Sequence, residues 1–337
     1  MANSLNESSI QLINLAKEVL KNYNIIPNDI SIIQSGTIKT VWKIKYTNSL
    51  LCLKRLRQSY DKSSFSVNAQ IYIKSKGGNV PGILLTIDKK AIHQYKDELF
   101  VLYEWMEGRE LNFNYNPDLA YAIKGLAAFH LASKGYAPDA SYRISSKINK
   151  WPNQYESMGN KLKKWKEDAY NKKSSNPYFS YIKAVDSMLD LSDNAQRLIA
   201  ASHYNELSAN NESQVLCHQD YGTGNALLGK NGVIILDLDG VTLDFPMRDL
   251  RKLIFKYEEP LGKWQSKMLS DILDWYSEIN PLSKDEKELL YIDLLFPHRF
   301  YGLVKNIFIS EKPIKASDIE RIAIFEESKL KLLKELL

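Results

Sequence analysis

The sequence predicts an α+β protein with two lobes, a small lobe built on an antiparallel sheet and a larger, mainly helical lobe. Two observations support this fold class. Short runs of β-forming residues separated by turn residues extend to Trp105, and segments with apolar residues at helical spacing follow Gly108. At 337 residues, with 44% hydrophobic and 25% charged residues, the chain has room for one large or two medium domains. We expect the first lobe over residues 1–107 and the second over residues 108–337.

The first lobe is expected to begin with an amphipathic helix over residues 9–21, because Ser8 and Gln11 can form a capping box before apolar residues at helical spacing. A turn at Thr47-Asn48-Ser49 predicts a hairpin between two of the strands that follow. The pattern predicts strands over residues 30–34, 41–46, 50–55, 91–95 and 100–105, and a helix over residues 63–76 that ends at Gly77-Gly78.

The second lobe is expected to open with a helix over residues 117–132 and to be helical again from Met247 onward. Between them, residues 145–207 are polar and Lys-rich, and we interpret them as a basic insertion with two or more helices. Four aromatic residues are interleaved with these lysines, which is one property of nucleic-acid surfaces: Trp151, Tyr155, Trp165 and Tyr170. Solvated lysines with aromatic side chains turned inward explain the pattern better, so no nucleic-acid partner is expected.

Three features of the sequence indicate the cellular compartment of the protein: its N-terminus, its apolar runs and its cysteines. Residues 1–7 show no basic region leading into an apolar stretch, and no apolar run approaches the roughly 18 residues of a membrane span. We therefore expect synthesis in the cytoplasm without a signal peptide, and no membrane association. Cys52 and Cys217 each lie in an apolar, strand-like run, which favours free buried thiols over a disulfide.

One short region carries most of the chemical information. The run Cys217-His218-Gln219-Asp220-Tyr221-Gly222-Thr223-Gly224-Asn225 is followed by an apolar strand that leads to Asp237-Leu238-Asp239. His-x-Asp-x4-Asn with a later Asp is the order in which phosphoryl-transfer enzymes present a base and two metal ligands. Any one of these residues alone would indicate only a turn or a helix cap, whereas the combined spacing predicts a kinase-like catalytic loop.

A hairpin between these motifs brings two of the candidate ligands together. Asn231-Gly232 is a strong hairpin signal between apolar segments at residues 226–228 and 233–238. A two-residue loop would place Asn225 opposite Leu238, and a four-residue loop would place it opposite Leu236. Either register puts Asn225 beside Asp237, and their oxygen atoms suit a hard cation such as Mg²⁺.

These motifs resemble the aminoglycoside phosphotransferase and choline kinase-like superfamily, which has a two-lobed protein kinase-like fold. The likeness extends to Leu53-Lys54-Arg55, Leu102-Tyr103-Glu104, Gly108 and Leu126-Ala127-Ala128-Phe129-His130. Within the superfamily, Cys-His-x-Asp-Tyr-Gly-x-Gly-Asn, Asp-Leu-Asp and Leu-Phe-Pro-His-Arg-Phe are most similar to the CotS-type spore coat proteins. The resemblance covers nearly the full length.

The resemblance implies an ATP- and Mg²⁺-dependent phosphotransferase that acts on a hydroxyl of a small molecule. It assigns Asp220 and His218 to catalysis, Asn225, Asp237 and Asp239 to the metal, and Lys54, Gly36, Glu104 and Met106 to the nucleotide. The apolar pattern does not decide whether Lys54 or Arg55 points inward, so Lys54 is chosen on the resemblance alone. It also implies a spore coat location and coat-protein partners, and it makes Asp249 a helix cap or a loop anchor.

The acceptor is not identified by these motifs. Asp271, Asp274 and Glu278 could hold an amine-bearing acceptor, although a solvated helix face explains them better.

Three departures from the superfamily pattern weaken the nucleotide end of the site. The expected helix over residues 63–76 has no Asp or Glu to pair with Lys54, and only Asn68 or Gln70 could substitute for one. The expected phosphate loop over residues 34–39 has one glycine, and Gln219 replaces the usual Gly between His218 and Asp220. A weak or inactive pseudokinase, serving as a structural or interaction protein of the spore coat, is therefore the alternative.

Two other classes of site were considered for Asp237-Leu238-Asp239-Gly240. Haloacid dehalogenase-like phosphatases begin with such a motif, but the helical sequence that follows lacks their later acidic cluster. A calcium-binding EF-hand loop needs Gly at its sixth position, where this chain has Thr242.

Overall fold

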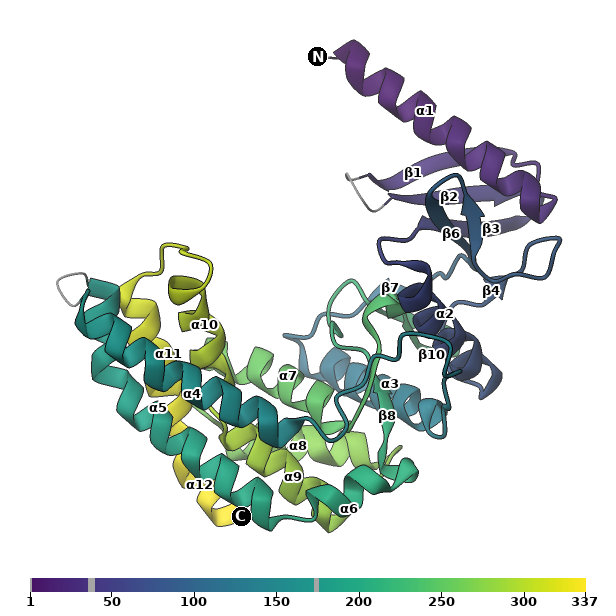
Figure 1. Ribbon diagram of the computed structural model, residues 1–337. Helices are drawn as coiled ribbons and strands as arrows, with labels where there is room; N and C mark the ends of the chain where they lie inside the picture. Colours follow the sequence, from purple (N-terminus) through teal and green to yellow (C-terminus); the bar gives the residue numbers. More distant parts are fainter. Residues whose placement is uncertain (1, 36–39, 173–175) are drawn as a thin grey trace. The chain divides into compact units, whose positions relative to one another are not determined.

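The computed structural model describes residues 2–35, 40–172 and 176–337 (Figure 1). Two units, each with its own core, make up the chain. The first unit contains Met1–Asn112, Tyr136–Ser145 and Gly222–Thr242, and the second contains Phe113–Gly135, Ser146–Tyr221 and Leu243–Leu337. The segment after the His-x-Asp motif therefore folds with the sheet of the first unit.

An antiparallel sheet flanked by two helices forms most of the first unit (Figure 1). Its elements are α1 (Ala2–Leu20), β1 (Asp29–Ser35), β2 (Thr40–Tyr46), β3 (Ser49–Arg55), α2 (Tyr60–Ser75), β4 (Ile83–Leu84), β5 (His93–Tyr95), β6 (Glu98–Glu104), β7 (Arg109–Glu110), β9 (Ala226–Gly229) and β10 (Gly232–Ile235). The main sheet has the order β1-β2-β3-β6-β4 with β5 also on β6, and a smaller sheet has the order β10-β9-β7. These bounds agree to within a few residues with the strands and with the second helix expected in this region. The expected start of the first helix was wrong, because α1 begins at Ala2 and Ser8 therefore lies inside the helix rather than capping it.

Alternation along the strands separates two apolar faces of the main sheet. Trp42, Ile44 and Leu53 point to the face covered by the buried side of α1 and form one core cluster with Phe100 and Leu102. On the other face, a second cluster combines Val67 of α2 with strand residues, among them Val101 and Tyr103. The odd-numbered leucines of β3 thus belong to the α1 face, and the even-numbered positions of β3 belong to the α2 face.

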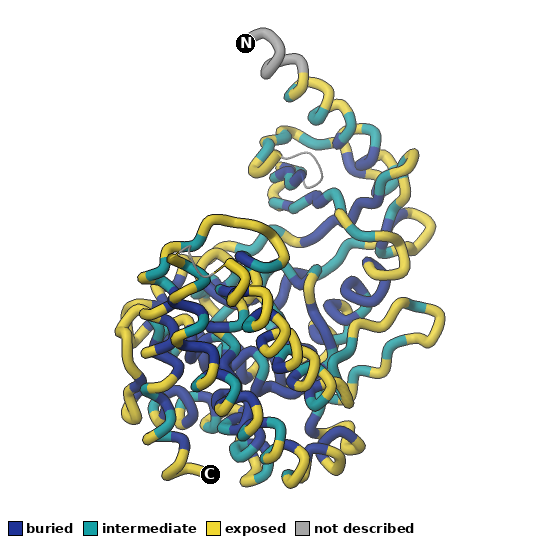
Figure 2. Tube along the Cα trace, turned by 60° about the vertical axis from the view of Figure 1, so that its left-hand side comes forward, coloured by how far each residue is buried: buried dark blue, intermediate teal, exposed yellow. Residues whose placement is uncertain are grey.

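The second unit is mainly helical, as expected. Its elements are α3 (Asn116–Ser133), α4 (Trp151–Tyr170), α5 (Asn176–Ala201), α6 (Tyr204–Ala209), β8 (Val215–Cys217), β11 (Thr242–Asp244), α7 (Met247–Glu258), α8 (Ser266–Ser277), α9 (Lys284–Leu295), α10 (His298–Phe308), α11 (Ala316–Ser328) and α12 (Leu330–Leu336). The short strands β8 and β11 pair with each other. The helices of this unit contain both buried and exposed positions, and the buried positions form its core (Figure 2).

The basic insertion corresponds to α4, α5 and α6, and its aromatic residues are mostly turned inward. Trp151, Tyr155 and Trp165 are buried, and Tyr170 is half exposed. The ring of Trp165 stacks on Phe308 at a centroid distance of 5.1 Å. The interleaved aromatic residues therefore build the core of this unit. Among the described helices, none combines the length and the apolar composition needed to cross a membrane.

One buried carboxyl group in the second unit makes the stability of the fold depend on pH. Glu258, at the end of α7, is fully buried, and its Oε2 accepts a hydrogen bond of 3.1 Å from the backbone N–H of Gln265. Its Oε1 has no hydrogen-bond partner among the described residues. Burial raises the pKa of Glu258 from 4.5 to about 7. The native state therefore holds a proton that the unfolded chain releases, and stability should fall as the pH rises between these two pKa values.

We predict that Glu258→Gln, which mimics the protonated carboxyl, is more stable than the parent at about pH 8 by on the order of 2 kcal/mol, with little difference at about pH 5. Urea unfolding at both pH values measures this difference. Glu335→Gln, at an exposed position of α12, serves as the control and should not change the pH dependence. An equal gain from Glu258→Gln at both pH values would contradict the raised pKa.

Candidate functional site

A pocket of about 410 Å³ in the first unit contains most of the residues assigned to nucleotide and metal. Its walls come from β1, β2, β3, β6, α2 and the β9–β10 hairpin. The predicted site residues that line it are Lys54, Glu104, Met106, Asn225, Asp237 and Asp239. Apolar side chains form another part of the wall, among them Ile33, Val41, Leu227 and Leu236. Gly36 lies outside the described residues.

Lys54 lies on the α2 face of the sheet and points into this pocket, whereas Arg55 lies on the other face. The ammonium Nζ of Lys54 is 2.6 Å from Oδ1 of Asp237 and 2.7 Å from Oδ1 of Asp239. Arg55 instead pairs with Glu98 at 2.8 Å. Burial alone would lower the pKa of Lys54, but the carboxylates of Asp239 and Asp237 outweigh it and raise the pKa. Of the two basic residues, Lys54 and not Arg55 therefore enters the pocket.

The two carboxylates come from a tight turn that directly follows the hairpin. Asp237 has a left-handed backbone conformation (φ 61°), and a single 3₁₀ turn, η3 (Leu238–Gly240), follows it. This backbone reversal lets side chains two positions apart reach one ammonium group. Gln58 supports the turn by donating a hydrogen bond of 3.0 Å from Nε2 to the carbonyl oxygen of Asp239.

The hairpin register places Asn225 opposite Leu236, one of the two registers expected. Val233 pairs with Leu228, and the N–H of Leu236 donates to the carbonyl oxygen of Asn225 at 3.0 Å. The expected turn position was wrong, because Gly229 pairs with Gly232 and the turn consists of residues 230–231. Gly232 is instead the first residue of β10 and has φ 103°, a backbone conformation that favours glycine.

Gly108 allows the hairpin to lie close to the end of the sheet. A Cβ atom at Gly108 would be 2.9 Å from Cβ of Leu227 and 3.0 Å from the carbonyl oxygen of Leu228. Those distances are too short for any side chain, which explains a glycine at this position.

Glu104 lines the pocket, and its carboxylate is bound to groups outside the pocket lining. Its Oε2 accepts hydrogen bonds from the N–H of Gly82 at 2.8 Å and from Lys74 at 3.1 Å. Burial would raise the pKa of Glu104, but these two donors lower it. The backbone N–H groups of Glu104 and Trp105 are also occupied, by the carbonyl oxygens of Gly82 and Leu50.

The helix α2 begins at Tyr60 and so contains one acidic residue, Asp61, but the ion pairs of Lys54 are with Asp237 and Asp239. Gln70 is buried in the pocket wall, but its Nε2 donates to the carbonyl oxygen of Pro81 at 2.7 Å. Asn68 donates to the carbonyl oxygen of Ser64 at 2.8 Å. Neither amide replaces the missing glutamate, and the carboxylates of Asp237 and Asp239 take its place beside Lys54.

His218 and Asp220 belong to the second unit, where they follow β8. His218 is fully buried, and its ring lies 6.2 Å from that of Phe129 and 5.8 Å from that of Tyr221. The N–H of Asp220 donates to Nδ1 of His218 at 3.3 Å. Asp220 itself is exposed. The imidazole thus shapes the backbone that presents Asp220.

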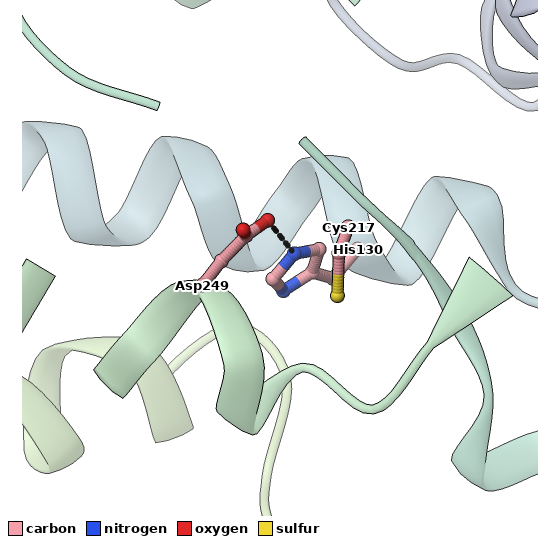
Figure 3. A group of neighbouring side chains, drawn as sticks. All are labelled: His130, Cys217 and Asp249. Carbon is pink, nitrogen blue, oxygen red and sulfur yellow. Dashed lines mark hydrogen bonds and ion pairs between the residues drawn. The ribbon is translucent and has the colours of Figure 1, made fainter. Parts of the chain in front are cut away.

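The buried carboxylate of Asp249 on α7 anchors this loop. Of the two roles expected for Asp249, a helix cap or a loop anchor, its contacts support the loop anchor. The N–H of His218 donates to Oδ2 of Asp249 at 2.5 Å, and the N–H of Gln219 donates to Oδ1 at 3.0 Å. Nε2 of His130 contacts the same Oδ2 at 3.3 Å (Figure 3). Burial would raise the pKa of Asp249, but the hydrogen bond and charge of His130 and the nearby cations lower it.

The network continues beyond His130 into α8. Nδ1 of His130 is 2.8 Å from the hydroxyl of Tyr276, which accepts a further hydrogen bond from Asn280 at 2.8 Å. Cys217 lies beside His130 and Asp249 (Figure 3), and its thiol donates to the carbonyl oxygen of Phe245 at 3.0 Å. Neither cysteine forms a disulfide, as expected, and Cys217 is buried whereas Cys52 is half-buried. Burial raises the pKa of the Cys217 thiol well above its ordinary value. These contacts explain the cluster without a bound metal.

Gln219 is held in a backbone conformation that glycine adopts more easily. Its φ is 73°, which accounts for the glycine usual at this position in the superfamily. The ammonium of Lys252 donates to the carbonyl oxygen of Gln219 and, at 3.0 Å, to its side-chain Oε1. Sequence reasoning missed this contribution of Lys252, which lies one helical turn after Asp249 on α7.

We predict that Asp249→Ala lowers the free energy of unfolding by about 3 kcal/mol, because two backbone N–H groups and His130 lose a buried acceptor. Asp249→Asn should cost less, since one carbonyl oxygen remains. Urea unfolding of both variants measures these changes. Asp271→Ala removes an exposed ion pair with Lys267 and should change stability by no more than about 0.5 kcal/mol. Equal effects of Asp249→Ala and this control would rule out the anchor.

Comparison with solved structures shows the fold. An aminoglycoside phosphotransferase from Alicyclobacillus acidocaldarius matches with a TM-score of 0.75 at 15% identity, covering 95% of this chain and 94% of that chain. The amicoumacin kinase hAmiN, solved in complex with AMP-PNP, Ca²⁺ and Ami, matches with a TM-score of 0.62 at 16% identity, covering 98% and 97%. The expected two-lobed, kinase-like fold class is confirmed.

Comparison with characterised sequences shows the family. Spore coat protein S of Bacillus subtilis (strain 168) is 24% identical over 336 residues, which cover 96% of this chain and 93% of that protein. The model of the family described as "Spore coat putative kinase YutH" matches residues 16–331. The chain has the fold of phosphotransferases and belongs to the YutH family of spore coat proteins.

Proposed function

We propose that this protein is an ATP- and Mg²⁺-dependent phosphotransferase that acts on a hydroxyl group of a small molecule. The observation that carries the proposal is the meeting of Lys54, Asp237 and Asp239 in one pocket with apolar walls. Solved neighbours support it, because they include an aminoglycoside phosphotransferase and a kinase in complex with AMP-PNP and Ca²⁺.

The donor atoms of this pocket suit a divalent cation and a nucleotide. Asp237, Asp239 and Asn225 offer oxygen atoms, which Mg²⁺ prefers. Asp237 and Asp239 already hold one positive charge between them, that of Lys54, so the pocket accommodates a cation. When bound, ATP would supply the phosphoryl group, and Mg²⁺ would neutralise part of the negative charge on the phosphate oxygens.

The remaining residues receive roles that follow from chemistry and position. Lys54 would bind nucleotide phosphates, because its ammonium lies beside the carboxylates proposed to hold the Mg²⁺ that binds the same phosphates. The backbone from Glu104 to Met106 would contact the base. The N–H groups of Glu104 and Trp105 are already bonded, which leaves this task mainly to Met106.

Asp220 is proposed as the base. It would accept the hydroxyl proton as the acceptor oxygen forms its bond to the γ-phosphorus and the bond from that phosphorus to the ADP oxygen breaks. Because His218 is buried and accepts a hydrogen bond from the N–H of Asp220, we assign His218 a positioning role.

Association with the spore coat and its proteins is the second part of the proposal. Its support is the family to which the chain belongs and the similarity to spore coat protein S.

A nucleotide-binding pseudokinase is the second candidate function, and one contact favours it. Lys54 is bonded to both proposed metal-ligand carboxylates. The one acidic residue of α2, Asp61 in its first turn, does not line the pocket that Lys54 enters. Such a protein would bind Mg-ATP and serve the coat through its surface.

We predict that Mg-ATP raises the melting temperature of the parent and that Asp237→Asn removes most of this shift, because one proposed metal ligand loses its charge. Differential scanning fluorimetry with ATP, with and without Mg²⁺, measures the shift. Asp97→Asn, at an exposed loop position of the same unit, is the matched control and should respond as the parent does. Absence of any shift at millimolar Mg-ATP would overturn nucleotide binding.

Turnover separates the two candidate functions. We expect ADP release from Mg-ATP to depend on a hydroxyl acceptor and to fall by at least about 100-fold in Asp220→Ala, which should keep the Mg-ATP shift. Coupled assays over a panel of hydroxyl compounds measure this rate. Binding of Mg-ATP without Asp220-dependent turnover would support the pseudokinase.

A further inference from the structure

A second pocket, of about 510 Å³, lies in the second unit beside Asp220. Parts of α7 and α10 form its walls together with the loop that carries Asp220. The basic side chains in its lining are Arg251, Lys252, Lys256, His298 and Arg299. The acidic residues in the lining are Asp220 and Glu259, so the wall has an excess of basic groups.

Part of this positive charge is neutralised within the protein. Arg251 pairs with the buried Asp293 at 2.6 Å, and Arg299 pairs with Glu259. Nε2 of His298 contacts Oδ1 of Asp293 at 2.7 Å. Burial lowers the pKa of His298 to about 3, so its imidazole is neutral at physiological pH. Arg251 and His298 therefore leave no unbalanced charge in the pocket. Glu259, by contrast, is shared between Arg299 and Arg321.

Two ammonium groups in the lining form no ion pair with a carboxylate in the part of the chain that the structure describes, although the buried carboxylate of Asp249 acts on Lys252 from a greater distance. Lys252 donates to the carbonyl and side-chain oxygens of Gln219, and both acceptors are neutral. Lys256 is exposed, and its Nζ lies 5.8 Å from the centroid of the Phe113 ring. Uncompensated charge at a concave surface attracts an anion.

The side chain of Gln219 adds a donor that lacks an acceptor. Its Oε1 must face Lys252, because an ammonium group can only donate, and this fixes the orientation of the amide. The amide Nε2 is then buried and has no acceptor among the described residues. A buried N–H without an acceptor is costly, and an incoming oxygen atom would relieve that cost.

We propose that this pocket binds the acceptor through an oxyanion, so that the substrate is a hydroxylated small molecule bearing a phosphate or a carboxylate. The inference rests on the proposed function for Asp220, and it names the substrate class. Lys252, Lys256 and the amide of Gln219 hold the oxyanion, and the hydroxyl of the substrate faces Asp220 in the same lining.

An amine-bearing acceptor does not fit this pocket. Its positive charge would meet the two unpaired ammonium groups of Lys252 and Lys256. Asp271 and Asp274 lie on α8 and Glu278 directly follows it, and these acidic residues line neither pocket described above. Asp271 pairs there with Lys267, and Glu278 pairs with Lys124. They behave as a solvated helix face.

The test compares four ligands with one three-carbon skeleton: glycerol 3-phosphate, glycerate, 3-amino-1,2-propanediol and glycerol. Isothermal titration of the full chain without nucleotide should detect binding of the phosphate or the carboxylate only, and added salt should weaken it. Lys256→Met should weaken that binding about tenfold, since one charge-assisted contact is lost. Lys164→Met, at an exposed position of α4, is the matched control and should bind as the parent does.

Three results would overturn the inference: the amine binds as well as the anions, no anion binds more tightly than glycerol, or Lys256→Met binds as the control does. The phosphate and carboxylate arms show which oxyanion the pocket prefers. The melting shift with Mg-ATP is measured in parallel. A melting shift with Mg-ATP but no anion binding would reject only the proposed anionic acceptor. Anion binding without phosphoryl transfer would reject the proposed enzymatic activity, while the pocket would remain an anion-binding site.

Discussion

The geometry of the loop before Asp220 depends on one buried carboxylate. Asp249 accepts the backbone N–H groups of His218 and Gln219 and also contacts His130, so α3, α7 and the end of β8 are joined at one point. A carboxylate can do this because its two oxygens offer several acceptor sites, and because charged acceptors make stronger hydrogen bonds. Without it, the positive φ of Gln219 would depend on the hydrogen bonds from Lys252.

The sequence predicted elements well where local rules determine them. The strands of the sheet, α2 and α3 follow from alternation and helical spacing, and the hairpin follows from its turn residues. The turn itself was misplaced by one residue, because Asn231-Gly232 is a strong local signal, whereas the pairing of Gly229 with Gly232 is set by packing. Local signals thus identify an element more securely than its register.

The site residues illustrate where sequence reasoning ends. The motif spacing brought Asn225 and Asp237 together through the hairpin, but it could not choose between Lys54 and Arg55. That choice depends on which face of β3 packs against α1, and this packing is set by tertiary structure rather than by the local sequence. The same holds for Lys252, whose link to Gln219 joins positions far apart in the chain. The second pocket is lined by residues of both α7 and α10, so it could not be predicted from any single stretch of sequence.

If a divalent cation and a nucleotide bind as proposed, the contact of Lys54 with two aspartates would link their binding. A divalent cation that approaches Asp237 and Asp239 must displace the ammonium, which would leave a buried positive charge without a partner. Phosphate groups arriving at the same time would give that ammonium a new partner. Metal and nucleotide should therefore enter cooperatively, with each raising the affinity for the other by the same factor. The ion pair of Lys54 with these aspartates would thus oppose the binding of either ligand alone.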